Sequence, residues 1–130
     1  MQAMEKLRGA LKLDPASAIA KQNISVSANN LAIKAEQAND EKLAKSYFHQ
    51  ALYYDPASDL VRTNLNNLLK SQGHDPLAFA VRTQLAEHYA KVNDLLDAVV
   101  EYQEAVRLKK DAQAERRLND LQRQYQLQSK

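Results

Sequence analysis

The chain is poor in the residues that break helices, and it has none of the residue that forms disulfides. Its 130 residues include two glycines, three prolines and no cysteine, and aromatic residues make up 6%. So little glycine and proline excludes the turn-rich sequence of a many-stranded sandwich or barrel. The absence of cysteine excludes disulfides, thiolate zinc ligands and a cysteine nucleophile. It leaves the compartment open, with the cytoplasm as the default.

Long apolar runs and an excess of one charge are also missing. No stretch approaches the roughly 18 apolar residues of a membrane-spanning helix, so no membrane span is expected. Eighteen basic and 16 acidic residues give a formal net charge of +2, which is too balanced for a dedicated binder of phosphate backbones. Apolar residues make up 45%, together with many strong helix formers. The composition predicts one all-α domain over residues 1–130.

Two internal repeats organise the sequence. Residues 3–17 (AMEKLRGALKLDPAS) align with residues 44–58 (AKSYFHQALYYDPAS) and end in the same four residues. A second match pairs residues 31–52 with residues 85–106, and it includes Asn39-Asp40 and Asn93-Asp94. Asparagine suits the left-handed position after a helix, and aspartate suits the N-cap of the next. Each unit therefore predicts two antiparallel helices joined by a tight turn.

The repeated positions form a recognisable pattern. The first helix has a leucine followed by a small residue, Leu31-Ala32. The second helix has an alanine, an aromatic residue and an Ala-Leu pair, and Asp-Pro follows it: Ala44, Phe48, Ala51-Leu52 and Asp55-Pro56. This pattern resembles the tetratricopeptide repeat, a unit of about 34 residues. The resemblance implies an antiparallel array of helix hairpins, a right-handed α-solenoid of about seven helices. Ala28 and Arg82 depart from the family, which commonly has a large aromatic residue there.

In this register the chain divides into five segments. They are a half repeat (1–15), a repeat with an extended first helix (16–58), a solitary helix (59–75), a second repeat (76–112) and a capping helix (113–130). The half repeat leaves an apolar face, with Leu7 and Leu11, that lacks its usual partner helix.

Residues typical of an active site are sparse. His49, His74 and His88 lie far apart, and each is expected on the surface or in a loop. The two glycines form no phosphate-binding loop. Glu101 and Glu104 are expected to face solvent opposite Arg or Lys. We therefore expect no enzymatic activity, no catalytic residue, no cofactor and no metal site.

Polar residues on the first helices are the remaining signal. In tetratricopeptide proteins these helices line the concave surface, and the positions carried over are Asn29, Asn30, Ile33, Thr63, Asn64, Asn67, Lys70, Thr83, Gln84 and Glu87. An amide both donates and accepts, so a row of amides could hold the backbone of an extended peptide. The alternative is plain polar surface, because an exposed helix tolerates asparagine at little cost.

The resemblance implies a non-enzymatic interaction scaffold that binds a peptide or helix of an unidentified protein on its concave face. The alternative is a structural segment that docks within a larger protein or forms a homo-oligomer through the face of Leu7 and Leu11. Nucleic-acid binding through Arg116, Arg117 and Arg123 is a third hypothesis, but the acidic residues among them favour an ordinary solvated helix. The family's basic clamp for chaperone tails is not expected, because its positions carry uncharged or acidic residues.

Overall fold

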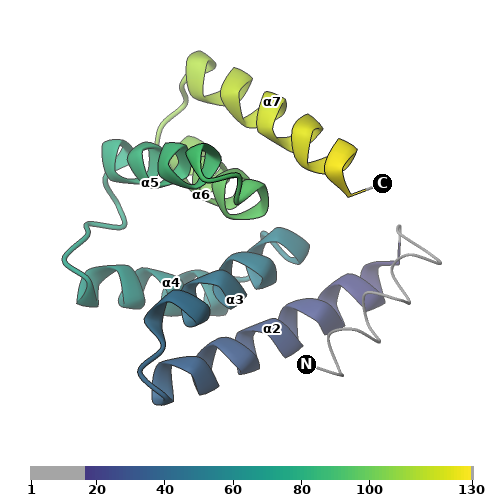
Figure 1. The fold of residues 1–130 in the computed structure, drawn as a ribbon, viewed down its shortest axis with the longest axis vertical. Helices are drawn as coiled ribbons and strands as arrows, with labels where there is room; N and C mark the ends of the chain where they lie inside the picture. Colours follow the sequence, from purple (N-terminus) through teal and green to yellow (C-terminus); the bar gives the residue numbers. More distant parts are fainter. Residues whose placement is uncertain (1–16, 130) are drawn as a thin grey trace. The chain divides into compact units, whose positions relative to one another are not determined.

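The computed structural model describes residues 17–129, which fall into two units, residues 17–68 and 69–129. The described residues form six helices: α2 (Ala18–Gln37), α3 (Glu41–Tyr54), α4 (Asp59–Ser71), α5 (Phe79–Lys91), α6 (Leu95–Leu108) and α7 (Ala112–Gln128) (Figure 1). They contain no strand, so the prediction of an all-α fold is confirmed for this part of the chain. The half repeat of residues 1–15, with Leu7 and Leu11, lies outside the described residues.

Each unit is built around a helix hairpin. In the first unit α2 packs against α3, and in the second α5 packs against α6, with α7 alongside α6 (Figure 1). The boundary between the units falls in the last turn of α4.

The hairpin turns depend on two asparagines in the left-handed conformation. Asn39 and Asn93 have φ angles of 60° and 65°, as the Asn-Asp pattern predicts. In each turn the N–H of the following aspartate, Asp40 or Asp94, donates to a carbonyl in the last turn of the preceding helix, at 2.9 and 2.8 Å. Carbonyl groups that would otherwise lack a partner at the helix end are thereby satisfied. Gly73, with φ of 86°, ends α4 in the same way.

The predicted N-caps form in one hairpin and only in part in the other. The carboxylate of Asp40 accepts the N–H of Leu43 at 3.1 Å and caps α3. Asp94 occupies the corresponding position before α6, but its side chain makes no capping hydrogen bond.

An Asp-Pro turn precedes both α4 and α5, and an arginine of the helix that follows holds each turn. Residues 55–65 (DPASDLVRTNL) and 75–85 (DPLAFAVRTQL) share this arrangement. Arg62 donates to the carbonyl of Pro56, and Arg82 Nε donates to that of Pro76 at 2.9 Å. Each arginine thus folds back over the first turn of its own helix. The caps differ, because Ser58 Oγ accepts the N–H of Val61 at the start of α4 whereas Ala78 gives α5 no side-chain cap.

The core between paired helices is made of small residues with a few large ones between them. In the first unit the alanines at 28, 32, 44 and 51 are fully buried beside Phe48 and Leu52. In the second unit the alanines at 86, 98 and 105 are fully buried at the matching positions. Alanine lets helix axes approach closely, and the aromatic ring fills the remaining space.

The second unit encloses charged side chains that the sequence predicted to be exposed. Glu101 and Glu104 are buried, so the expectation that both face solvent is wrong. Arg82 reaches across the hairpin, and its Nη1 donates to Glu101 Oε1 at 2.9 Å, with 1% and 0% of the two side chains exposed. The helix α5 therefore supplies a buried cation that makes a buried carboxylate on α6 tolerable. His49, on α3, is also fully buried and not on the surface.

Candidate binding groove

A groove of about 730 Å³ opens in the second unit. Three residues of α5, one of α6 and six at the start of α7 line it: Phe79, Thr83, Glu87, Tyr102, Asp111, Gln113, Ala114, Arg116, Arg117 and Asp120. The α5 residues recur every four positions, which places them on one face of that helix. The groove therefore runs along α5 and α7, with α6 contributing a tyrosine.

A polar network connects the three helices at one end of the groove. Arg117 donates to both carboxylate oxygens of Glu87, from Nε at 2.8 Å and from Nη2 at 3.1 Å. The hydroxyl of Tyr102, a buried side chain, also donates to Glu87. A two-pronged arginine–carboxylate contact fixes the geometry of both groups. The network consequently holds α7 in a defined position against α5 and α6.

The network also sets the protonation states of its members. The hydrogen bonds from Arg117 hold the pKa of Glu87 below its usual range, and the same contact raises the pKa of Arg117. Burial, followed by the hydrogen bond to Glu87, raises the pKa of Tyr102 to about 12. At neutral pH Glu87 is therefore ionised and Tyr102 is protonated. Neither group titrates near the pH at which general acid–base chemistry would use it.

At the other end of the groove a cation lies over an aromatic ring. The Nζ of Lys109 is 5.3 Å from the centroid of the Phe79 ring, which is within the range of a cation–π contact. Nearby, the carboxylate of Asp111 accepts the backbone N–H of Gln113 at 2.9 Å and caps α7. The Lys109 ammonium and the Asp111 carboxylate are thus each in contact with another group of the same chain.

Two charged side chains on the rim remain available. Arg116 and Asp120 are exposed, and neither makes a hydrogen bond or ion pair with any residue that the structure describes. Between them the groove offers a ligand one free cation and one free anion above a partly aromatic wall.

The structure distributes the ten predicted concave residues between the two units. Thr83 and Glu87 lie together in the groove. Asn29 and Asn64 meet within the first unit, where Asn64 Nδ2 donates to Asn29 Oδ1 at 3.1 Å, and Asn29 is buried. The other six are exposed side chains outside the groove: Asn30, Ile33, Thr63, Asn67, Lys70 and Gln84.

Most of the groove was not predicted, because α7 was interpreted only as a polar cap. The spacing of its apolar residues was the available signal: Ala114, Leu118 and Leu121 repeat the spacing of Val61, Leu65 and Leu68 in α4. In that alignment Arg117 falls on the position of Asn64. Both residues reach from the helix after a hairpin to the first helix of that hairpin, Asn64 on α4 to Asn29 on α2 and Arg117 on α7 to Glu87 on α5.

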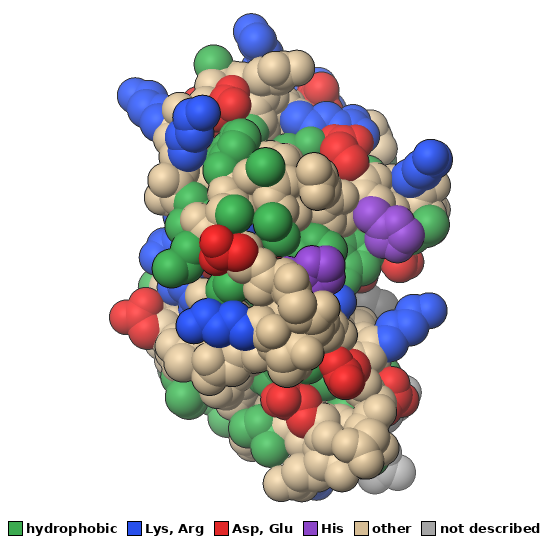
Figure 2. Space-filling model, turned by 90° about the vertical axis from the view of Figure 1, so that its left-hand side faces the viewer, with side chains coloured by type: hydrophobic (Ala, Val, Ile, Leu, Met, Phe, Trp, Pro, Cys, Tyr) green, Lys and Arg blue, Asp and Glu red, His purple; other side chains and the backbone are tan. Residues whose placement is uncertain are grey.

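The face of the molecule drawn in Figure 2 shows no grouping of charge by sign. On the face drawn in Figure 2, basic and acidic side chains are interspersed. Among the described residues, no three His, Asp or Glu side chains gather to hold a metal ion. Within the same part of the chain, every helix is too short or too polar to cross a membrane.

No protein family model and no curated protein matches the sequence.

Proposed function

We propose that this chain is a non-enzymatic protein-interaction module of tetratricopeptide-like architecture, which binds a peptide or helix of a partner protein in the groove between α5 and α7. The observation that carries the proposal is the groove itself, where aromatic and arginine side chains line an open channel between a first and a third helix.

The repeat-like features of each unit support the architectural part of the proposal. Both hairpins turn on a left-handed asparagine, and both pack on buried alanines. An Asp-Pro turn starts the helix after the first hairpin. These are the features that the resemblance implies, and they recur along the chain as a repeat requires.

The side chains of the groove suit a protein ligand. Arg116 is an exposed residue of a type that carries much of the binding energy at protein interfaces, and Phe79 adds an aromatic wall. Tyr102 and Arg117 are held by Glu87 and shape the groove. Thr83 and Gln113 add groups that can hydrogen-bond a peptide backbone. The Glu87–Arg117 contact fixes one wall in advance, so little ordering is required when a ligand binds.

The same network favours binding over catalysis. Glu87 is stabilised as an anion and is a weak base, and Tyr102 keeps its proton until strongly alkaline pH. The runner-up functions remain self-assembly or docking in a larger protein through Leu7 and Leu11, which lie outside the described residues. The hypothesis of nucleic-acid binding through Arg116, Arg117 and Arg123 is weakened, because Arg117 forms an ion pair with Glu87.

Selection from a phage-displayed library of random peptides on the immobilised full chain tests the proposal. Selected peptides are then titrated against Thr83→Trp, which fills the middle of the groove, and Arg116→Glu, which reverses its free cation. We expect each change to weaken binding at least about tenfold, or 1.4 kcal/mol. Arg123→Glu is the matched control, because Arg123 is also an exposed arginine of α7 but does not line the groove.

Two results would contradict the proposal. One is a library that yields no peptide above the background of an unrelated helical protein. The other is a set of peptides that bind all three variants as tightly as the unaltered chain, because these would occupy another surface.

A further inference from the structure

Helix α2 turns three of its five larger apolar side chains toward solvent, while small residues make up most of its buried face. Ile19, Val26 and Ile33 are 72%, 60% and 36% exposed. Its buried apolar residues are four alanines and one isoleucine: Ala20, Ile24, Ala28, Ala32 and Ala35. A surface helix ordinarily has the opposite arrangement. Isoleucine and valine also form helices less readily than alanine, so helix formation does not explain their presence on the exposed side.

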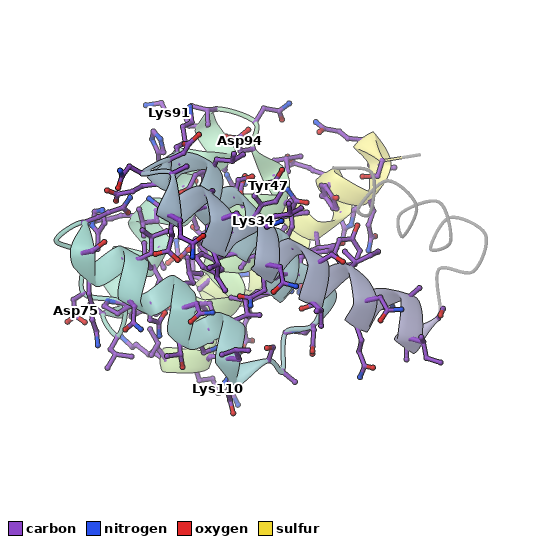
Figure 3. All side chains as sticks on the ribbon, turned by 90° about the horizontal axis from the view of Figure 1, so that it is seen from below. Lys34, Tyr47, Asp75, Lys91, Asp94 and Lys110 are labelled. Atoms are coloured by element: carbon purple, nitrogen blue, oxygen red, sulfur yellow. The ribbon has the colours of Figure 1, made fainter. Side chains whose placement is uncertain are left out.

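The three exposed residues form one continuous stripe, the outer stripe of α2. They recur every seven residues, which is nearly two full turns, so each lies almost directly above the last. The helix has 20 residues and is about 30 Å long at 1.5 Å per residue. In Figure 3 α2 lies in front of α3, so its outer side is toward the viewer. The seven-residue spacing therefore gives the helix one straight apolar ridge.

Charge is almost absent from the stripe. The exposed side chains on the same side of the helix are amides, at Gln22, Asn23, Asn30 and Gln37, and Lys34 lies at its edge. The exposed Lys21 lies on the other side of the helix. In a chain of which 26% is charged, this is an unusually neutral surface. An amide donates and accepts, so it can pair with another amide. The stripe is therefore complementary to a copy of itself and to no strongly charged partner.

We propose that the outer stripe of α2 binds the same stripe of a second copy of this chain, with the two helices antiparallel about a two-fold axis at Val26. In that arrangement residues equally far from Val26 face one another. Ile19 packs against the partner's Ile33, Val26 against the partner's Val26, and Gln22 pairs with the partner's Asn30. No two like charges are brought together.

The extent of this surface sets the strength of the dimer. Stable interfaces bury about 1,200–2,000 Å² in total, and a contact between two single helices of this length lies at or below that range. The dimer is consequently a weak one that forms and dissociates with concentration. It uses a different surface from the groove of the second unit, and neither inference depends on the other.

Disulfide trapping tests the arrangement directly, because the full chain has no cysteine of its own. A disulfide requires Cα atoms about 4.4–6.8 Å apart, so only facing positions bond rapidly. We expect Val26→Cys to form a covalent dimer by itself. A mixture of the Ile19→Cys and Ile33→Cys proteins should form the covalent dimer rapidly. Each of these two proteins alone should form it at least tenfold more slowly. Leu60→Cys, 65% exposed on α4, is the matched control and should bond only slowly.

Sedimentation equilibrium gives an independent measurement. Val26→Glu places two carboxylates together at the axis and should raise the dissociation constant of the dimer at least tenfold, whereas Leu60→Glu should leave it unchanged. Circular dichroism confirms that both variants keep their helices.

Three outcomes overturn the proposal. Fast disulfide formation by Ile19→Cys alone would mean that the two helices pack in parallel. Equal rates of disulfide formation in all variants would mean that the cysteines meet by random collision. A monomer at every concentration would mean that the stripe does not bind a second copy of the chain.

Discussion

The buried ion pair of Arg82 and Glu101 leads to a quantitative prediction about the stability of the second unit. Glu101→Gln keeps the shape of the side chain but removes the carboxylate charge that pairs with the Arg82 cation, which is 1% exposed. Removing one partner of a buried pair costs about 3–5 kcal/mol. For a chain of this size that is expected to lower the melting temperature by roughly 10–20 °C.

Removing both charges should cost much less than removing one. In Arg82→Met with Glu101→Leu, neither charge of this pair remains to be desolvated, and apolar replacements of a buried pair are often neutral. Arg82 also donates to the carbonyl of Pro76, so we expect the double variant to lose about 1 kcal/mol for that hydrogen bond. The double variant should therefore be more stable than Glu101→Gln alone.

Urea denaturation followed by far-ultraviolet circular dichroism measures these differences. Arg107→Gln is the control, because Arg107 makes a longer and more exposed contact with Glu104, at 3.9 Å, and should contribute less than about 1 kcal/mol. The reasoning is refuted if Glu101→Gln costs no more than this control. It is also refuted if the double variant loses the sum of its two single variants.

Three further predictions concern the turns, the first unit and the groove. Asn39→Ala should lower the free energy of unfolding by about 1 kcal/mol because Asn39 has a φ angle of 60°, whereas Asn39→Gly should not lower it. Equal melting temperatures of the two variants would contradict this prediction. Asn64→Ala leaves the buried amide oxygen of Asn29 without its partner and should cost about 1–3 kcal/mol in urea denaturation, whereas the exposed Asn67→Ala should cost little. The pKa of Glu87 is lower in the folded state than its ordinary value of 4.5. The contribution of the Glu87–Arg117 ion pair to stability is therefore present above pH 4.5 and is lost as the pH falls through the folded-state pKa. The difference in stability between the unaltered chain and Glu87→Gln, about 1 kcal/mol at most, should thus disappear in acid, and a difference that persists there would show that the ion pair is not its source.

The helix hairpins could be predicted from the sequence because their determinants are local. Asn39-Asp40 and Asn93-Asp94 specify a turn within a few residues, and the alanine spacing specifies which face is buried. The burial of Glu101 could not be found in this way. Its local pattern is that of a solvated helix, and only the partner on the facing helix, Arg82, makes its burial tolerable.

The groove illustrates the same difference. Thr83 and Glu87 were predicted because the family resemblance places first-helix residues on a binding surface. Tyr102 and Arg117 were not, since nothing near them in the sequence indicates that both contact Glu87. The buried hydrogen bond between Asn29 and Asn64 likewise depends on two helices meeting, and it converts two expected ligand contacts into internal ones.

Each of the following hydrogen bonds between helices joins two residues of one unit. Thirty-five residues separate Asn64 from Asn29 and Gln128 from Asn93, and 30 separate Arg117 from Glu87. The hydrogen bond between the described helices of the first unit can therefore form before the second unit has been translated. Synthesis at about 5–20 residues per second gives it several seconds, and helical domains fold within milliseconds. On the ribosome the chain is expected to acquire its structure in two steps, with the first unit complete while the second is still emerging.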